Sequence, residues 1–303
     1  MKIGIMTVND DTFHPNARLI AEAGKLGHQV MLIDPYGVSC CVDSHDSKIF
    51  FKPDTMLAPG FNHKDSLPDL ILPRQGSPMG EYGFVLLRHF AMLGVPLVNG
   101  LEGITIAKHQ YITLQQLCRA GLRVPQAFFV TRPDNFYAAV NALGGFPVVA
   151  KQVDGMGGDG VERLGGKDAA MAYLKTHFIP GKGVVVEPFI HHECALRLLV
   201  VNNKVAGAMA LTPDPGQFKA NIHQNARSAG FQPDEKIADM AIRSAQACCL
   251  DIAGVDILMA KDCGPVVIEV NYSPGFRGLE AATGKNIAKI MLECAISLSG
   301  FRP

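Results

Sequence analysis

The stretch AGVDILMAKDCGPVVIEVNYSPG, at residues 253–275, decides the fold. Two largely apolar runs, 253–260 and 265–271, lie on either side of Lys261-Asp-Cys-Gly264. Apolar runs of this length, separated by a short polar segment that ends in glycine, are typical of a β-hairpin. We therefore expect a hairpin here and interpret the rest of the chain around it.

The register of this hairpin follows from the length of its loop. If the four residues between the runs form the loop, Ala260 faces Pro265 and, counting back along both strands, Asp256 faces Glu269. Asn271 points to the same face as Glu269, because side chains alternate along a strand. Two carboxylates and an amide then share one face.

Opposed carboxylates repel each other unless one is protonated or a cation lies between them. Two acids and an amide oxygen are hard ligands that suit Mg²⁺ or Mn²⁺. The alternative is an exposed polar sheet face, but the neighbouring Ile257, Val266, Val267, Ile268 and Val270 make full exposure unfavourable. The sequence therefore favours a metal site made of Asp256, Glu269 and Asn271.

A second dense feature is KQVDGMGGDG at residues 151–160, with four glycines in six residues. Such a loop offers backbone N–H groups free of side-chain obstruction, which suits phosphate oxygens, and Lys151 adds a positive charge. A glycine-rich surface loop is the alternative. Together with a magnesium site, the loop predicts nucleotide binding, because Mg²⁺ commonly binds through a few protein ligands plus substrate phosphates.

Apolar periodicity elsewhere predicts an α/β chain of three units, at residues 1–98, 99–184 and 185–303. The first unit resembles a small doubly wound domain without a G-x-G-x-x-G fingerprint. Its expected elements are strands 2–7, 28–33 and 69–74, helices 15–26 and 82–93, the segment 95–98 and a loop over 52–68. The other units should contain strands 127–130, 147–152, 195–201 and 205–211 and helices 105–120, 234–250 and 286–298.

Composition excludes several classes of protein. The chain has 303 residues, of which 48% are hydrophobic, and it carries 28 basic and 28 acidic side chains. That balance gives no overall field that would favour nucleic acids or anionic membranes. The first residues run directly into a strand pattern, and no later stretch approaches the roughly 20 apolar residues that span a bilayer. We expect a cytoplasmic protein that binds neither membranes nor nucleic acids.

The eight cysteines are scattered and include no C-x-x-C, so they predict reduced thiols rather than disulfides or a zinc ribbon. His191-His-Glu-Cys194 is the one dense cluster of possible metal ligands. Consecutive residues rarely converge on one ion, so we interpret this cluster as a polar surface loop.

The order of these motifs along the chain resembles the ATP-grasp superfamily and, within it, the RimK-like α-L-glutamate ligases. The resemblance runs almost end to end and is most specific at Ala253-Gly-Val-Asp256 followed by Ile268-Glu-Val-Asn-Tyr-Ser-Pro-Gly275. Other matching segments are Leu72-Pro-Arg74, Phe90-Ala-Met-Leu-Gly94, Val148-Val-Ala-Lys151, Asp154–Gly160, Val186-Glu-Pro-Phe-Ile190 and Phe218–His223. The resemblance implies an ATP-grasp fold of three subdomains, with ATP held between two α+β units, and it implies a dimer or tetramer.

The resemblance also implies a set of binding residues. The ATP phosphates would contact Lys108, Lys151, Gly155, Met156, Gly157, Gly158 and Gly160. The backbone of Glu187, Pro188, Phe189 and Ile190 would meet adenine at a hinge, and Glu193 would take the ribose. Asp256, Glu269 and Asn271 match the family's magnesium ligands.

The substrate side departs from the family pattern. Arg197 matches an arginine expected to contact phosphate or the acyl phosphate, with a surface salt bridge as the alternative. Lys219 replaces the usual arginine ahead of Asn221, and Arg277 stands where an acid is more common. Arg277 would favour an anionic group or pair with Glu280. The nucleotide half resembles the family closely, whereas the acceptor half is altered.

The activity implied is an ATP-dependent ligase that joins a carboxylate to an amine of a small molecule or peptide tail. The carboxylate attacks the γ-phosphate, and the amine then displaces phosphate from the acyl phosphate. A kinase with the same fold, or a nucleotide-binding regulatory protein without turnover, is the alternative.

Overall fold

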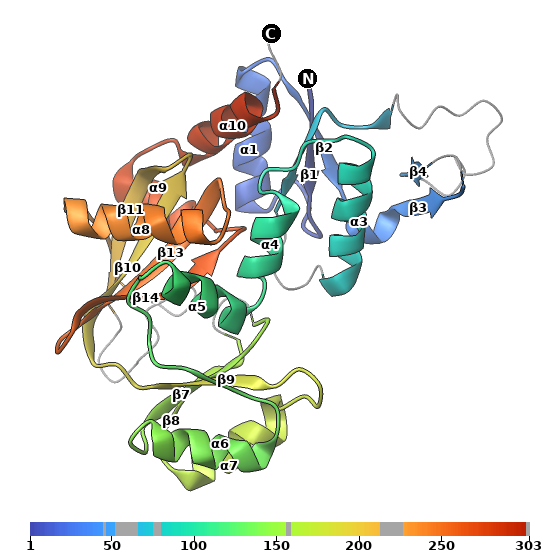
Figure 1. Ribbon diagram of the computed structural model, residues 1–303. Coiled ribbons are helices and arrows are strands. Elements are labelled where there is room, and N and C mark those ends of the chain that lie inside the picture. Colours follow the sequence, from blue (N-terminus) through green and yellow to red (C-terminus); the bar gives the residue numbers. More distant parts are fainter. Residues whose placement is uncertain (45–46, 52–65, 75–79, 156–158, 213–226, 301–303) are drawn as a thin grey trace.

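The computed structural model describes residues 1–44, 47–51, 66–74, 80–155, 159–212 and 227–300 (Figure 1). Its strands form a parallel N-terminal sheet, an antiparallel middle sheet, an antiparallel C-terminal sheet and a separate two-stranded hairpin. The mixed α/β class is therefore confirmed. Across the described ranges, no helix is both long and apolar enough to cross a membrane.

The N-terminal sheet has the order β2-β1-β5, and its strands are β1 (Lys2–Met6), β2 (Gln29–Ile33) and β5 (Leu70–Pro73). All pairs are parallel, with β1 in the middle. Helix α1 (His14–Lys25) makes the crossover between β1 and β2, as parallel strands require. The strand–helix–strand opening is confirmed, and both faces of the sheet are buried.

Four further elements complete this part of the chain: η1 (Pro35–Gly37), β3 (Ser39–Val42), β4 (Ser47–Phe50) and α3 (Gly80–Met92). The β3–β4 hairpin was not predicted, and most of the expected loop 52–68 lies outside the described residues. Leu97 makes a single parallel bridge to Ile71 and so extends the sheet beside β5.

The single helix expected over 105–120 is wrong, because the structure has two helices, α4 (Leu101–Ala107) and α5 (Gln110–Arg119). The backbone is extended at His109, whose Nδ1 accepts a 3.4 Å hydrogen bond from Ile112 N. The amide of Gln110 donates a 2.9 Å hydrogen bond to the carbonyl of Val153 instead of bonding within a helix. This hydrogen bond satisfies the first amide of α5 and joins the helix to the start of the glycine-rich loop.

The middle sheet has the order β6-β9-β7-β8 and is antiparallel throughout. Its strands are β6 (Phe128–Val130), β7 (Val148–Gln152), β8 (Val161–Leu164) and β9 (Val184–Pro188). Two helices, α6 (Pro133–Ala142) and α7 (Lys167–His177), lie together on one side of the sheet (Figure 1). Phe136 and Tyr173, both buried, anchor these helices to the sheet.

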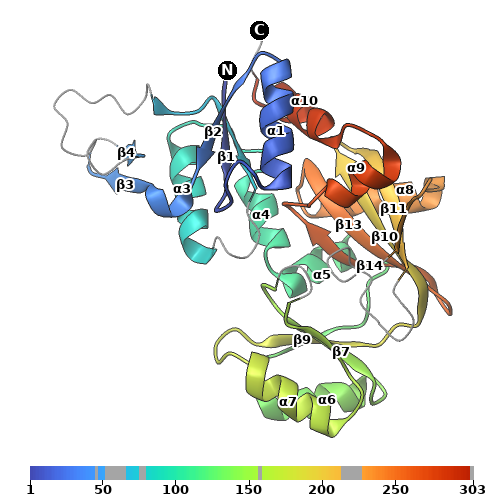
Figure 2. The same cartoon turned by 180° about the vertical axis from the view of Figure 1, so that it is seen from behind.

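The C-terminal sheet has the order β12-β11-β10-β13-β14. Its strands are β10 (His192–Val201), β11 (Lys204–Thr212), β12 (Arg227–Gly230), β13 (Ile252–Ala260) and β14 (Gly264–Asn271). Helix α8 (Glu235–Ala247) packs in one hydrophobic cluster with this sheet, and α9 (Arg277–Thr283) and α10 (Ile287–Leu298) pack in another. Helix α10 also lies beside α1, which joins the two ends of the chain (Figure 2).

Candidate functional site

The predicted loop of the β13–β14 hairpin is wrong by one residue. Ala260 pairs with Gly264 rather than with Pro265, so the loop has three residues. Gly264 has a φ of +77°, a left-handed conformation that lets the chain turn one residue early. A bulge at Ile268 then shifts the register back, and the predicted pairing of Asp256 with Glu269 is confirmed.

Asp256 is held on its other side by Arg197. The two residues lie directly opposite each other in β13 and β10, and Arg197 donates from Nε to Oδ1 at 2.8 Å and from Nη2 to Oδ2 at 2.6 Å. Their side chains are 24% and 12% exposed. The salt bridge considered for Arg197 is therefore present, but it lies within the carboxylate site rather than on the surface.

Glu269 stands in the least favourable electrostatic surroundings of this site. Burial raises the pKa of its carboxyl, and the charge of Asp256 raises that pKa further. Arg197, Lys151 and a hydrogen bond with Asn271 act in the opposite direction. Asn271 lies two residues after Glu269 and pairs with Gly254, so the third predicted oxygen donor is an amide rather than an acid.

The middle sheet contributes a buried ion pair to the same region. Lys151 Nζ lies 2.7 Å from Glu187 Oε2, across neighbouring strands β7 and β9. Both side chains are buried, and Glu187 Oε1 has no hydrogen-bond partner among the described residues. The predicted lysine and the carboxylates of the C-terminal sheet are thus near enough for Lys151 to influence Glu269.

The base of the glycine-rich loop is closed by backbone contacts. Gln152 N donates to Gly160 O at 3.1 Å, and Tyr173 Oη donates to the same carbonyl at 2.8 Å. A side chain at Gly155 would lie 2.6 Å from Asp159 O, and Gly160 has a φ of +65°. Met156, Gly157 and Gly158 lie outside the described residues.

Lys108 lies at the break between α4 and α5, and its Nζ donates to Gly80 O at 3.0 Å. It stands two residues before Gln110, the residue that bonds Val153 at the start of the glycine-rich loop. The hydrogen bond between Gln110 and Val153 therefore links the segment that carries Lys108 to the start of the glycine-rich loop.

The predicted hinge, residues 187–190, begins at the end of strand β9 in the middle sheet and leads to β10 of the C-terminal sheet. Arg163 lies over the Phe189 ring, 4.6 Å from its centroid. Glu193 is exposed near the start of β10. His191 is exposed as well, and the described residues include no group of three His, Cys, Asp or Glu side chains able to hold an ion.

The acceptor-side residues are less completely placed. Lys219 and Asn221 lie outside the described residues. Arg277 is exposed at the start of α9, and the described part of the chain offers it no ion pair. The considered pair with Glu280 does not form, because Glu280 accepts from Arg18 Nε at 2.9 Å and Nη2 at 3.2 Å.

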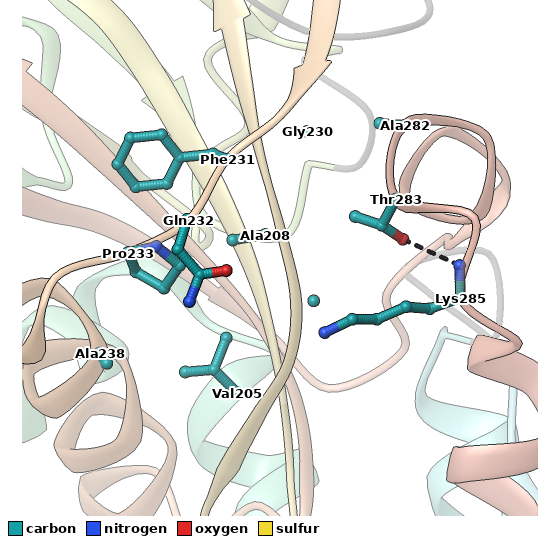
Figure 3. A pocket seen from close by; sticks show the side chains of 11 residues that line it. Val205, Ala208, Gly230, Phe231, Gln232, Pro233, Ala238, Ala282, Thr283 and Lys285 are labelled. Carbon is teal, nitrogen blue, oxygen red and sulfur yellow. Dashed lines mark hydrogen bonds between the residues drawn. The ribbon is translucent and has the colours of Figure 1, made fainter.

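A cavity of about 470 Å³ lies elsewhere, between β11, β12, α8 and α9. Figure 3 shows Phe231, Gln232 and Pro233 on one side of it and Ala282, Thr283 and Lys285 on the other. Among the described residues, no acidic side chain lines it, and the Lys285 ammonium donates to Ala206 O at 2.8 Å. The residues that line this cavity are different from those of the carboxylate site.

Arg74 is a buried polar residue for which no sequence pattern predicted a role. It follows β5 directly, is 9% exposed, and donates from Nη2 to Pro274 O at 2.7 Å. Arg74 belongs to Leu72-Pro-Arg74, one of the segments that resemble the family, but that resemblance implied no role for it. The contact joins residues 200 positions apart, which local patterns cannot reveal.

Comparisons with known proteins match this chain over nearly its whole length. The model of the RimK-like ATP-grasp domain matches residues 107–295, and the RimK PreATP-grasp domain matches residues 1–104. A probable alpha-L-glutamate ligase of Aliivibrio salmonicida is 33% identical over 297 residues, which cover 97% of this chain and 94% of that protein.

Solved structures show the same fold. A RimK domain protein of the ATP-grasp type from Sphaerobacter thermophilus has a TM-score of 0.72 at 21% identity, covering 98% of this chain and all of that one. The D-alanine–D-alanine ligase of Bacillus anthracis complexed with ATP has a TM-score of 0.71 at 19% identity, with 99% of each chain covered. The expected ATP-grasp fold is confirmed, and this chain belongs to the RimK-like ATP-grasp family of ATP-dependent ligases that form carbon–nitrogen bonds.

Proposed function

We propose that this ligase joins a carboxylate to an amine through an acyl phosphate and that L-glutamate is one of its two substrates. The observation that carries the proposal is the pairing of Asp256 with Glu269, with Arg197 and Lys151 beside them. The relatives named probable alpha-L-glutamate ligases supply the choice of glutamate.

Asp256, Glu269 and Asn271 would hold Mg²⁺ or Mn²⁺. Their donor atoms are carboxylate and amide oxygens, which hard divalent cations prefer. Burial and, after it, the charge of Asp256 raise the pKa of Glu269, and a cation between the two acids would offset both effects. When bound, such an ion neutralises negative charge on the nucleotide phosphates.

The phosphates of ATP would lie between this hairpin and the glycine-rich loop. Lys108, Lys151 and the backbone N–H groups from Gly155 to Gly160 supply positive charge and hydrogen-bond donors there. Glu187 holds the Lys151 ammonium at 2.7 Å, which fixes the lysine in one place before the nucleotide arrives. Adenine would contact the backbone of residues 187–190, and Glu193 would accept hydrogen bonds from the ribose hydroxyls.

The reaction then needs mainly positioning and electrostatic stabilisation. A carboxylate oxygen of the donor attacks the γ-phosphorus, and the bond to the bridging oxygen of ADP breaks. The amine nitrogen attacks the acyl carbon, inorganic phosphate leaves, and the nitrogen loses a proton. Arg197, fixed by two hydrogen bonds to Asp256, keeps a positive charge beside the transferring phosphoryl group.

Lys219, Asn221 and Arg277 would contact the substrates, which are a small molecule or a peptide tail together with the amino acid. Because Arg277 is exposed and forms no ion pair with described residues, it is available to an anionic substrate group. We further propose subdomains at 1–98, 99–184 and 185–303, a dimer or tetramer, and a cytoplasmic location.

ADP release tests this function. The purified protein is incubated with Mg-ATP and L-glutamate, with and without a pool of amino acids, peptides and small-molecule cell extract. Glu269→Gln should abolish release while leaving the thermal unfolding midpoint close to that of the wild type, because it removes a ligand charge and no core volume. Glu293→Gln, an exposed acid on α10, is the matched control and should remain fully active.

Release that depends on L-glutamate and on Glu269 supports the proposal, and mass spectrometry of the product then identifies the new amide. Release that is unchanged in a folded Glu269→Gln variant contradicts the metal site. Release that ignores glutamate but requires another acid contradicts the substrate and leaves the ligase class in place.

A further inference from the structure

Arg74 is a buried cation that has no acidic partner among the described residues. Its side chain is 9% exposed, and the described residues provide it with no salt bridge. Nη2 donates to Pro274 O at 2.7 Å, whereas Nε is buried and has no hydrogen-bond partner in the described part of the chain. Burial without a neighbouring acid lowers the pKa of this guanidinium to about 10.

Such an arrangement is costly for the free protein. A buried charge normally has a counter-charge, and a buried donor normally has an acceptor. The face of Phe276, 5.7 Å from Arg74 Cζ, offers only a weak cation–π contact in exchange. A neutral side chain could donate to Pro274 O equally well, so the hydrogen bond alone does not account for a guanidinium here.

The position of Arg74 in the fold indicates a ligand. It stands at the carboxyl end of β5, and its amide donates to Met6 O at the end of β1 at 3.0 Å. In sheets of parallel strands, ligands bind at this edge. A second unpartnered nitrogen, the buried Nδ1 of His14, lies at the same place, and its ring meets Phe276 edge-on at 6.0 Å.

The carbonyl that Arg74 contacts belongs to the segment that leaves the carboxylate hairpin. Pro274 follows Asn271 by three residues, a length of chain that spans at most about 10 Å. Gly254, the partner of Asn271, has no side chain there, and a Cβ would lie 2.7 Å from Pro274 Cβ. Pro274 is therefore packed directly on the hairpin, and Arg74 contacts a carbonyl that lies three residues from the proposed metal ligand Asn271.

We propose that Arg74 binds a carboxylate of the amino-acid substrate, namely one that is not consumed in the reaction. A carboxylate held by a guanidinium is a weaker nucleophile, so the reacting carboxylate should be a different one. The guanidinium fork suits the two oxygens of a carboxylate, and lysine does not reproduce that geometry. This inference rests on the proposed function and names one more residue of its substrate site.

The test compares Arg74→Met and Arg74→Lys with the wild type in glutamate-dependent ADP release. Losing a hydrogen-bonded charge contact should raise the KM for L-glutamate roughly 10- to 100-fold in Arg74→Met, with the KM for ATP unchanged. Arg74→Lys should recover little of this loss. Arg243→Met is the matched control, because Arg243 also donates to a backbone carbonyl at 2.7 Å but lies exposed beside Asp239.

Two further readouts separate substrate binding from a structural role. Methylguanidinium added to Arg74→Ala should restore the KM for L-glutamate. L-Glutamine and L-isoglutamine, each with one carboxylate converted to an amide, should both be tried in place of L-glutamate. The analogue that lacks the reacting carboxylate should support no release by either protein. The wild type should use the analogue that lacks the bound carboxylate at least tenfold less well than L-glutamate, and Arg74→Met should lose that discrimination.

The inference can fail separately from the proposed function. If the wild type releases ADP with glutamate but Arg74→Met has an unchanged KM, the inference is wrong and the function stands. If the wild type shows no glutamate-dependent release, thermal unfolding with L-glutamate alone decides. A midpoint that rises in the wild type and not in Arg74→Met supports the inference, whereas equal shifts, or no shift, overturn it. A variant that only loses stability indicates an acid of this chain as the partner.

Discussion

Two arginines of this protein meet opposite electrostatic conditions. Arg197, in the C-terminal sheet, makes two hydrogen bonds with Asp256, which lies directly across from it. Arg74, at the end of the N-terminal sheet, is more buried and yet has a single neutral acceptor among the described residues. The first charge is balanced by Asp256, whereas no described residue balances the second.

The two arginine sites therefore differ in whether the protein alone supplies the partner of the guanidinium. The hairpin around Asp256 is preformed, since its pairing is fixed by strand register and by an internal ion pair. The surroundings of Arg74 are complete only when an anion arrives. A site of the first kind loses function and stability together when its arginine is removed, whereas a site of the second kind should lose function alone.

The largest effect should come from Asp256→Asn. This change removes a proposed metal ligand and takes from Arg197 the carboxylate that accepts its two hydrogen bonds, which leaves Glu269 as its remaining acidic neighbour. ADP release should fall about 100- to 1000-fold, the range seen when one strong electrostatic contact is lost from an active site. Initial rates with Mg-ATP measure it, and Asp239→Asn, an exposed acid paired with Arg243, should retain full activity.

Arg197→Met should destabilise the metal-free protein by about 2 kcal/mol, less than the loss of a fully buried pair because Arg197 is partly exposed. The change leaves Asp256 and Glu269 facing each other without the neighbouring cation. Millimolar MgCl₂ should therefore raise the unfolding midpoint of the variant more than that of the wild type. Equal shifts in the two proteins would show that no divalent cation takes the place of the guanidinium.

Arg74→Met should leave the unfolding free energy unchanged or raise it by up to about 1 kcal/mol, since it removes a buried charge whose counter-charge is missing. Chemical denaturation at neutral pH, side by side with Arg197→Met, measures the contrast. If Arg74→Met lowered the free energy of unfolding by more than about 2 kcal/mol, the folded protein would already provide a partner for this arginine. The proposed difference between the two sites would then be wrong.

The hairpin shows what a sequence can and cannot determine. The pairing of Asp256 with Glu269 followed from counting along two strands, but the loop was one residue shorter than expected. The bulge at Ile268 restored the register. The shorter loop without the bulge, or the bulge without the shorter loop, would have placed the two acids on opposite faces of the sheet. Alternation along strands is a local property, whereas a bulge depends on partner strands that the sequence does not identify.

Other elements were missed for the same reason. Helices α6 and α7 have few strongly apolar positions, and their burial depends on the middle sheet. At the break beside His109, Gln110 bonds Val153, which lies more than 40 positions away along the chain. The strand that pairs with Lys151 could not be identified from the sequence either. What could be predicted were the residue types that the chemistry requires. The tertiary contacts that decide whether the charges of these residues are balanced could not be predicted.

The smallest effect should come from a charge with several partners, Glu22 of α1. Hydrogen bonds from Lys25, then from Asn286 and Arg18, lower the pKa of its carboxyl from 4.5 to about 2. A depressed pKa contributes stability that is fully present above pH 4.5 and is lost as the pH falls toward 2. Glu22→Gln should therefore flatten the dependence of unfolding free energy on pH in that window, with little change in its slope near neutrality. Unfolding of both proteins between pH 2 and 7 measures this, and parallel acid limbs would show that Glu22 is not tied to its neighbours in the folded state.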